Sequence, residues 1–282
     1  MNKNDDLGNR MKGYENISRY YLTKKTPVII RIDGKAFHSF TKGFKKPFDD
    51  ILMKSMQETA KYLCANIMGC KLAYTQSDEI SLLLVDYERN ESQSWFENNL
   101  VKMVSVSASM ATMAFSKAMC KEINAFENTH NPTYANAGFY TKMWDSYENE
   151  KMDTIYRNAY YNGAMFDARA FIIPKEEVCN YFIWRQQDAT RNSIQMVAQS
   201  LFSHKELQNK NCKELQELMF QEKGVNWNDF DNVCKRGSCI IKETYNISEE
   251  CIRTRWIVDK DIPIFTQDRE YIDKYVFCKK EN

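Results

Sequence analysis

The first 174 positions contain a succession of segments that differ in the spacing of their apolar residues. Runs of β-branched residues or alternating patterns predict strands, whereas apolar residues repeated every three to four positions predict helices. Strand, helix, strand, strand, helix, strand is the order of the ferredoxin-like split βαβ sheet. We therefore predict an α+β fold with an antiparallel sheet and flanking helices. The predicted segments are strand 27–33, helix 48–68, strands 71–75 and 79–87, helix 95–123 and strand 164–174.

The remaining segments surround this pattern. A short helix is predicted at 14–23, and the polar residues 124–162, rich in Asn, Tyr and Glu, are expected to form a long irregular insertion that is partly mobile. Helical patterns follow at 175–202 and 212–224, and β-like runs follow at 237–244 and 251–259. We expect residues 1–173 to form the catalytic domain and residues 174–282 to form a helical and β extension, integrated with it as one unit.

Composition limits the compartment and the partners. Lys and Arg total 39 against 38 acids, so net charge gives no argument for a polyanionic partner. No apolar run reaches the roughly 20 residues of a membrane span, and the polar start with Asp5 and Asp6 argues against a secretory signal. The nine cysteines form no C-x-x-C pair, which favours reduced thiols over a structural zinc. We expect an intracellular protein that does not enter membranes, in the cytoplasm or, alternatively, in the mitochondrion.

Acidic residues occupy two ends of the predicted strands. Asp33 ends the first strand, and Asp78 and Glu79 lie where the hairpin enters the third. In a split βαβ sheet these strands are antiparallel neighbours, so the acids should meet at one edge. Such like charges repel unless a cation intervenes, and a few carboxylates suit Mg²⁺ with phosphate. Gly34 leaves room for a phosphate. Each motif alone also fits ordinary turn chemistry, but their conjunction predicts a metal–nucleotide site.

Four blocks of sequence carry a family resemblance. "RIDGKAFHSFTKGFKKPFD", "YTQSDEIS", "FDARAFIIP" and "YFIWRQQDATRNSI" occur in this order from Arg31 to Ile194, and a weaker block, "CKRGSCIIK", extends to Lys242. They resemble the signature blocks of the tRNA-histidine guanylyltransferase family. The resemblance implies a palm-like catalytic domain, similar to that of ordinary polymerases, that adds nucleotides to the 5′ end of tRNA in the 3′→5′ direction.

The resemblance also implies roles for individual residues. Asp33 and Asp78 correspond to metal-binding carboxylates, Gly34 lends a backbone carbonyl to a metal, and Glu79 supports these ligands in catalysis. The implied nucleotide-binding residues are Asp33, Gly34, Lys35, Ala36, Phe37, His38, Ser77 and Asp78. The residues expected at phosphate or tRNA are Arg31, Lys46, Lys102, Arg185, Arg191, Lys235 and Arg236.

Four positions also have simpler structural interpretations. Lys235 and Arg236 also fit a solvated turn, and Arg169 could pair with Asp167 within its strand. Trp184 is expected in the core.

The reaction that the resemblance implies needs two Mg²⁺ ions, with ATP, GTP and other nucleoside triphosphates as substrates. Two such ions stabilise the attacking and leaving oxygens of an in-line displacement. ATP activates a 5′-monophosphate tRNA end as an adenylylated intermediate, and the 3′-hydroxyl of the incoming nucleotide attacks it. The family further implies tRNA as partner and a homotetramer.

One block distinguishes branches of the family. The branch specific for histidine tRNA has "HINNLYN" where this chain has "ATRNSIQ", from Ala189 to Gln195. The chain instead resembles the guanylyltransferase-like branch, which repairs or edits tRNA 5′ ends using the tRNA as template. One alternative is a tRNA-histidine guanylyltransferase that adds a single untemplated G. Another is a catalytically silent tRNA-binding module, although retention of the three acids speaks against it.

Overall fold

The computed structural model describes residues 6–130, 139–248 and 251–278. Its strands form one sheet of six in the order β4-β1-β3-β2-β5-β6, and each neighbouring pair is antiparallel. The order of the first four strands is that of a split βαβ sheet, so the predicted α+β, palm-like fold is confirmed. The strands are β1 Val28–Gly34, β2 Cys70–Gln76, β3 Glu79–Leu84, β4 Phe166–Ile172, β5 Ser238–Ser248 and β6 Cys251–Asp259.

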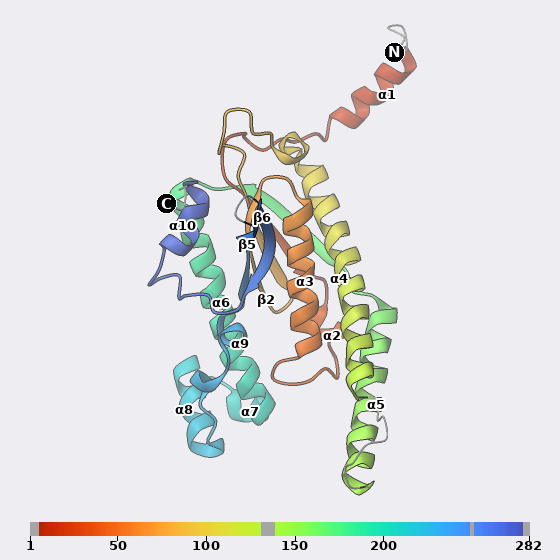
Figure 1. Cartoon of the computed structure of the whole chain (residues 1–282), viewed down its shortest axis with the longest axis vertical. Helices are drawn as coiled ribbons and strands as arrows, with labels where there is room; N and C mark the ends of the chain where they lie inside the picture. Colours follow the sequence, from red (N-terminus) through yellow and green to blue (C-terminus); the bar gives the residue numbers. More distant parts are fainter. Residues whose placement is uncertain (1–5, 131–138, 249–250, 279–282) are drawn as a thin grey trace.

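Helices cover both faces of the sheet (Figure 1). Alternate residues of β1 point to opposite faces: Ile30 and Ile32 join the core under α3 (Asp50–Asn66) and α4 (Leu100–His130). Ile29 joins a second core with α6 (Lys175–Leu201) and α10 (Glu270–Val276). None of the described helices combines the length and the apolar character that a bilayer crossing needs. The shorter helices are α1 Asp6–Asn16, α2 Phe37–Phe40, α7 His204–Leu207, α8 Cys212–Lys223, α9 Asn232–Arg236 and the 3₁₀ turns Trp95–Asn98 and Trp227–Asp229.

Residues 124–162 correct one prediction. The expected irregular insertion is largely helical in its described part, because α4 continues to His130 and α5 (Phe139–Asn162) runs beside it, while residues 131–138 lie outside the description. Met152, Ile155, Tyr156 and Ala159 recur at helical spacing and pack into the α3/α4 core. This apolar stripe was hidden among the polar residues.

Two further predictions are wrong. The first helix spans Asp6–Asn16, earlier than predicted, and Tyr21 instead forms an isolated bridge with Asn99. Trp184 is 48% exposed instead of buried, because it lies on the outer side of α6, with the Arg185 guanidinium 3.6 Å from its ring centre.

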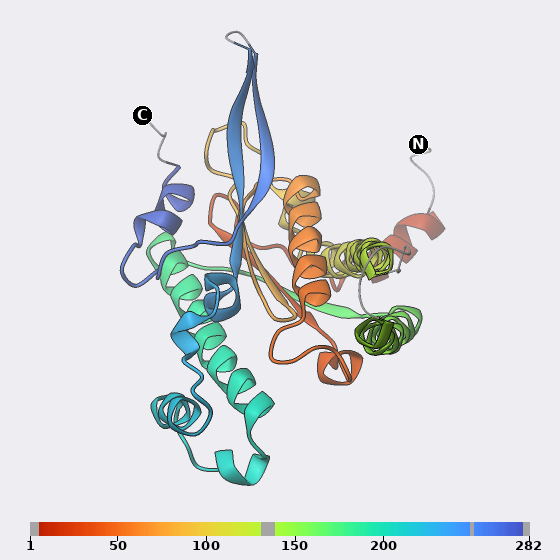
Figure 2. The same cartoon turned by 60° about the horizontal axis from the view of Figure 1, so that its bottom comes forward.

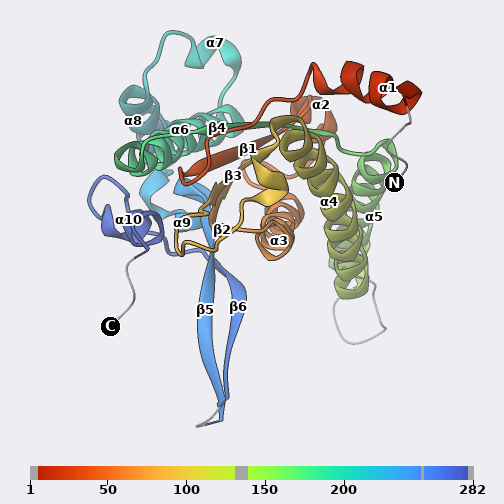
Figure 3. The same ribbon diagram turned by 90° about the horizontal axis from the view of Figure 1, so that it is seen from above.

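The strands β5 and β6 form a long ribbon. Only Ser238–Ile240 of β5 pair with β2, and the rest of the two strands projects beyond the sheet (Figures 2 and 3). Gly237, with φ of 79°, precedes β5. A Cβ atom there would lie 2.5 Å from the Thr75 carbonyl oxygen, so glycine permits the close approach of β5 to β2. The extension after residue 174 thus supplies both a helix on one face and a strand at the sheet edge.

Candidate active site

The β2–β3 hairpin brings two acids together. Ser77 and Asp78 form its turn, between the paired residues Gln76 and Glu79, and Ser77 has a φ of 49°. Asp33 of β1 is the cross-strand partner of Glu79, and the Gly34 amide donates a hydrogen bond to the Asp78 carbonyl at 3.1 Å. The register therefore confirms that the end of β1 meets the start of β3.

Asp33 and Asp78 have the chemistry of a cation site. Burial raises the pKa of Asp78, and the charge of Asp33 adds to the shift, although the Ser77 hydroxyl donates to the Asp78 carboxylate at 3.1 Å. A bound cation would offset this repulsion. Within the described residues no group of three or more His, Cys, Asp or Glu side chains is placed to hold a metal. Two carboxylates and the Gly34 carbonyl nevertheless fit Mg²⁺, which takes its remaining ligands from phosphate and water.

Glu79 has a different environment from Asp78. It is 5% exposed, and its carboxylate forms ion pairs with Arg185 of α6 at 2.8 Å and with Arg31 of β1 at 3.1 Å. Burial raises the pKa of Glu79, and the charges of Arg185 and Arg31 oppose this shift. Arg31 also approaches Asp33 at 3.6 Å, and Arg185 approaches Asp188 at 3.3 Å. Glu79 thus holds two guanidinium groups next to the Asp33–Asp78 pair.

The loop after β1 is fixed by its packing. The Lys35 amide donates to the Met165 carbonyl at 2.8 Å, and Ala36, with a φ of 55°, precedes α2. A Cβ on Gly34 would lie 2.2 Å from the Phe37 ring, which is buried in the α3/α4 core. Lys35, Ala36 and His38 are exposed, whereas the Phe37 side chain is a core residue. A ligand could therefore contact the exposed residues and the backbone of the predicted nucleotide loop, but not the Phe37 side chain.

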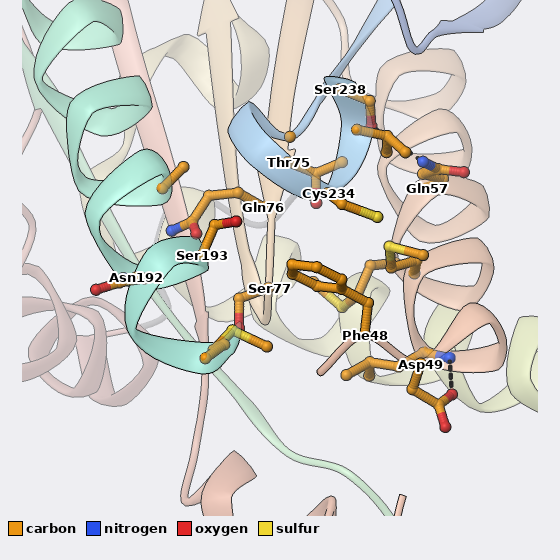
Figure 4. Close-up of a pocket in the computed structure, with 17 residues that line it drawn as sticks. Phe48, Asp49, Gln57, Thr75, Gln76, Ser77, Asn192, Ser193, Cys234 and Ser238 are labelled. Atoms are coloured by element: carbon orange, nitrogen blue, oxygen red, sulfur yellow. Dashed lines mark hydrogen bonds between the residues drawn. The ribbon is translucent and has the colours of Figure 1, made fainter. Parts of the chain in front are cut away.

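A partly open, mostly apolar cavity lies beside the hairpin turn. In Figure 4, Gln76 and Ser77 reach it from the hairpin, Ser193 from α6, and Phe48 from the segment just before α3. Asn192 of α6 also lines it. Met53, Met56 and Met196 add thioether surface. The sequence analysis missed this cavity because its lining comes from four separate segments and is mostly apolar. Of the lining residues, Ala189, Asn192 and Ser193 belong to the block from Ala189 to Gln195 that distinguishes the branches of the family.

Asp49 also lines the cavity, but its carboxylate is satisfied within the chain. It accepts hydrogen bonds from the Lys45 amide at 3.0 Å, the Leu52 amide at 2.9 Å and the Tyr156 hydroxyl at 2.7 Å. The Leu52 bond caps the N-terminus of α3. Asp49 therefore connects α3 to α5.

The predicted phosphate and tRNA residues fall into two groups. Arg31 lies 3.6 Å from Asp33. Arg191 is half exposed beside Asp188 on α6, and the Arg236 carbonyl accepts a hydrogen bond from the Tyr74 hydroxyl, near the end of β2. Lys235 is next to Arg236 in α9, where its ammonium donates to the Asn228 carbonyl at 2.7 Å. Lys46 is exposed in the connection between α2 and α3.

Arg185 and Lys102 do not fit the expectation. The Arg185 side chain is 4% exposed and paired with Glu79 and Asp188, so phosphate cannot reach it in this structure. Lys102 lies at the start of α4, which follows Asn98. Asn98 lines a small cavity with Val28 and Leu84. These residues are at the end of the sheet opposite Asp33, so a single chain does not bring Lys102 to the acids.

An antiparallel palm-like sheet, with two acids at adjoining strand ends and a cavity beside them, is the architecture of a nucleotidyltransferase. The family model described as "tRNAHis guanylyltransferase" matches residues 8–174. The chain belongs to the tRNA(His) guanylyltransferase family.

Similarity extends over nearly the whole chain in solved structures. A bacterial tRNA(His) guanylyltransferase-like protein in complex with ATP is 46% identical, with a TM-score of 0.78, and covers 97% of this chain and 100% of its own. A complex with GTP matches at 45% identity, a TM-score of 0.74 and the same coverage. Among curated proteins, the tRNA(His) guanylyltransferase of Debaryomyces hansenii is 28% identical over 82% of this chain and 78% of its own length.

Proposed function

We propose that this protein adds nucleotides to the 5′ end of tRNA in the 3′→5′ direction, choosing each base by pairing with the opposite strand of the tRNA. The observation that supports it most is the meeting of Asp33 and Asp78 beside a cavity next to the hairpin turn. The bacterial relatives bound to ATP and to GTP support a site that accepts both purine nucleotides.

Asp33, Asp78 and the Gly34 carbonyl would hold two Mg²⁺ ions, which would supply charge stabilisation to the attacking and leaving oxygens. In the first step an oxygen of the 5′-monophosphate attacks the α-phosphorus of ATP, and pyrophosphate leaves. In the second, the 3′-hydroxyl of the incoming nucleotide attacks the activated 5′-phosphorus, its proton passes to solvent, and AMP leaves. Arg31, held by Glu79 and Asp33, presents positive charge to these phosphates.

The cavity beside Ser77 is the proposed place of the nucleobase. Its thioethers and the Phe48 ring offer adaptable apolar surface. The side-chain amides of Gln76 and Asn192 each carry donor and acceptor groups, so either purine edge can be satisfied by an amide rotation. A site of this kind binds ATP and GTP without fixing the base, and the template must then supply the choice.

The resemblance supports three further proposals. The partner is tRNA, bound largely through its shape and backbone. The protein acts inside the cell, in the cytoplasm or a mitochondrion. It assembles as a homotetramer, in which a second copy could bring its Lys102 to the acids that Lys102 of the same chain does not reach.

A second candidate function is addition of one untemplated G to histidine tRNA. The descriptions of the curated relatives favour it, since the Debaryomyces hansenii and Saccharomyces cerevisiae proteins are both called tRNA(His) guanylyltransferases. The block from Ala189 to Gln195 favours templated addition instead, because Asn192 and Ser193 there line the cavity without the histidine-specific motif.

The test is to offer tRNAs that lack one or more 5′ nucleotides, with ATP and each nucleoside triphosphate, and to sequence the products. We expect restoration of the missing nucleotides on several tRNAs. An Asp33→Ala variant should give no product while keeping the far-ultraviolet circular dichroism of the parent. Products confined to a single G on histidine tRNA would support the second candidate, and no product from any tRNA would refute nucleotide addition.

A further inference from the structure

The strand β4 continues the charged rows of the site to the sheet edge. Asp167 is the cross-strand partner of Asp33, and Arg169 is the cross-strand partner of Arg31. Ala168 and Ala170 pack on the α3/α4 side, whereas Phe171 packs on Tyr181 of α6, with ring centres 5.8 Å apart. Asp167 and Arg169 therefore face the α6 side, the same side as Asp33, Arg31 and Glu79.

Each row places like charges opposite one another. Asp167, Asp33 and Glu79 form an acidic row across β4, β1 and β3, and Arg169 and Arg31 form a basic row beside it. Like charges directly opposite on adjacent strands are destabilising. Glu79 is compensated by Arg31 and Arg185, and the Asp33–Asp78 pair fits a cation. Arg31 is in turn compensated by Glu79 and Asp33, whereas Arg169 has among the described residues only its pair with Asp167.

The two arginines differ in how firmly they are held. Arg31 is 20% exposed and forms ion pairs with both Glu79 and Asp33. Arg169 is 61% exposed, and among the described residues its one ion pair is with Asp167, at 3.9 Å. A pair that long and that exposed contributes little. The Arg169 guanidinium therefore stands next to the acids with its donors available to an anion.

We propose that Arg169 binds the 5′-terminal phosphate of the RNA substrate. This proposal rests on the proposed function, and the position of β4 indicates the side from which the RNA end approaches the acids. In the strand order, the cavity proposed for the nucleobase lies towards β2 and β5, whereas β4 lies on the other side of β1. A nucleotide in the cavity would approach Asp33 from the β2 side of β1. The β4 side of β1 is then open to the RNA end. A terminal phosphate monoester, with more charge than an internal phosphodiester, is the anion that a free guanidinium binds best.

The test compares two RNAs that differ only in a 5′-phosphate or a 5′-hydroxyl, with binding measured by fluorescence anisotropy in Mg²⁺ without nucleotide. We expect the parent to bind the phosphorylated RNA about tenfold more tightly. Arg169→Gln should bring this ratio close to one while the affinity for the 5′-hydroxyl RNA stays within about twofold, and Arg169→Lys should retain part of the preference.

Arg255 supplies a matched control, because it is also 61% exposed and pairs with one acid, Glu243, but lies on the β5–β6 ribbon. Arg255→Gln should leave the ratio unchanged. Equal weakening of both RNAs by Arg169→Gln, an unchanged ratio, or a parent without the preference would each overturn the proposal. Templated addition is judged separately, by product sequence, so either proposal can fail while the other stands.

Discussion

Asp78 and Glu79 are neighbours in sequence, but their side chains meet different surroundings. Asp78 is close to Asp33 and bears a raised pKa, whereas Glu79 is surrounded by guanidinium groups. The repulsion between Asp78 and Asp33 destabilises the fold unless a cation binds, whereas the ion pairs of Glu79 stabilise the fold. Substitutions at the two sites should therefore change stability with opposite signs.

Asp78→Asn should abolish nucleotide addition and raise the melting temperature at pH 7 in EDTA. Burial and Asp33 raise the folded-state pKa of Asp78 above its usual value of 3.8, so ionised Asp78 costs stability above that pKa and no longer does so once both states are protonated. The gain should shrink towards pH 4. Thermal unfolding between pH 4 and pH 8 measures it, and Mg²⁺ should stabilise the parent more than the variant. A variant less stable than the parent at every pH would contradict this prediction.

Arg185→Met should destabilise the protein by about 3 kcal/mol at pH 7, because it leaves buried Glu79 with only Arg31. The pKa of Glu79, already raised by burial, loses its largest opposing charge and rises further. The loss should therefore be smaller at pH 5, where Glu79 in the variant takes up a proton, than at pH 8. Urea unfolding measures both values.

Arg255→Met is the control for Arg185→Met, since its pair with Glu243 is exposed and should be worth less than about 1 kcal/mol. An Arg185→Met variant as stable as this control, but with weakened RNA binding, would return Arg185 to the role of a direct RNA contact.

The positions of single side chains could be predicted where the residue lies at the end of a strand. The meeting of Asp33 with the Asp78–Glu79 pair followed from strand order alone. Arg185 and Trp184 could not be assigned in this way, because which of two adjacent helix residues faces the sheet depends on a rotation of about 100° per residue. The Arg185 side chain faces the sheet, where it forms an ion pair with Glu79 of β3, and the Trp184 side chain is on the solvent-exposed side of α6.

At the scale of elements, the attachment of β5 to β2 depends on one glycine. Gly237 has φ 79° and ψ −162°, a backbone region open almost only to glycine, and its added Cβ would meet the Thr75 carbonyl. Gly237→Ala should cost about 3 kcal/mol and loosen the ribbon. Gly224, with φ of 65° and open space around it, is the matched position, and Gly224→Ala should cost about 1 kcal/mol. Equal losses in urea unfolding would show that the β5–β2 contact adjusts without strain.

Element types were predictable where the apolar pattern was strong, as in β1, α3 and the β2–β3 hairpin. The α5 helix was missed because its apolar stripe, from Met152 to Ala159, sits in a polar segment whose composition suggested irregular structure. The ribbon was predicted only as β-like runs, since the pairing of Ser238–Ile240 with β2 joins residues more than 160 positions apart. No local pattern specifies such a contact.

The whole molecule is nearly neutral, with a net charge of +1, yet we expect its affinity for tRNA to fall steeply with salt. Counterion release depends on local phosphate contacts and gives a slope of about −0.7 to −0.9 in log affinity against log salt for each contact. Arg191→Gln and Lys235→Gln should each reduce the slope by about one contact. Filter binding at salt concentrations from roughly 50 to roughly 300 mM measures this slope. A salt-insensitive affinity would mean that α6 and α9 present no phosphate-tracking surface.

The central claim is that the tRNA, and not a side chain, chooses the added base. The side-chain amides that line the cavity are those of Gln57, which donates to the Ser238 hydroxyl, and of Gln76 and Asn192, and neither of the last two is committed to one purine edge. The most direct measurement uses one tRNA lacking its first 5′ nucleotide, in four versions that differ only in the nucleotide opposite the missing base, supplied with ATP and all four nucleoside triphosphates. The account predicts that the added base follows each change by Watson–Crick pairing. Addition of G to all four versions would contradict it.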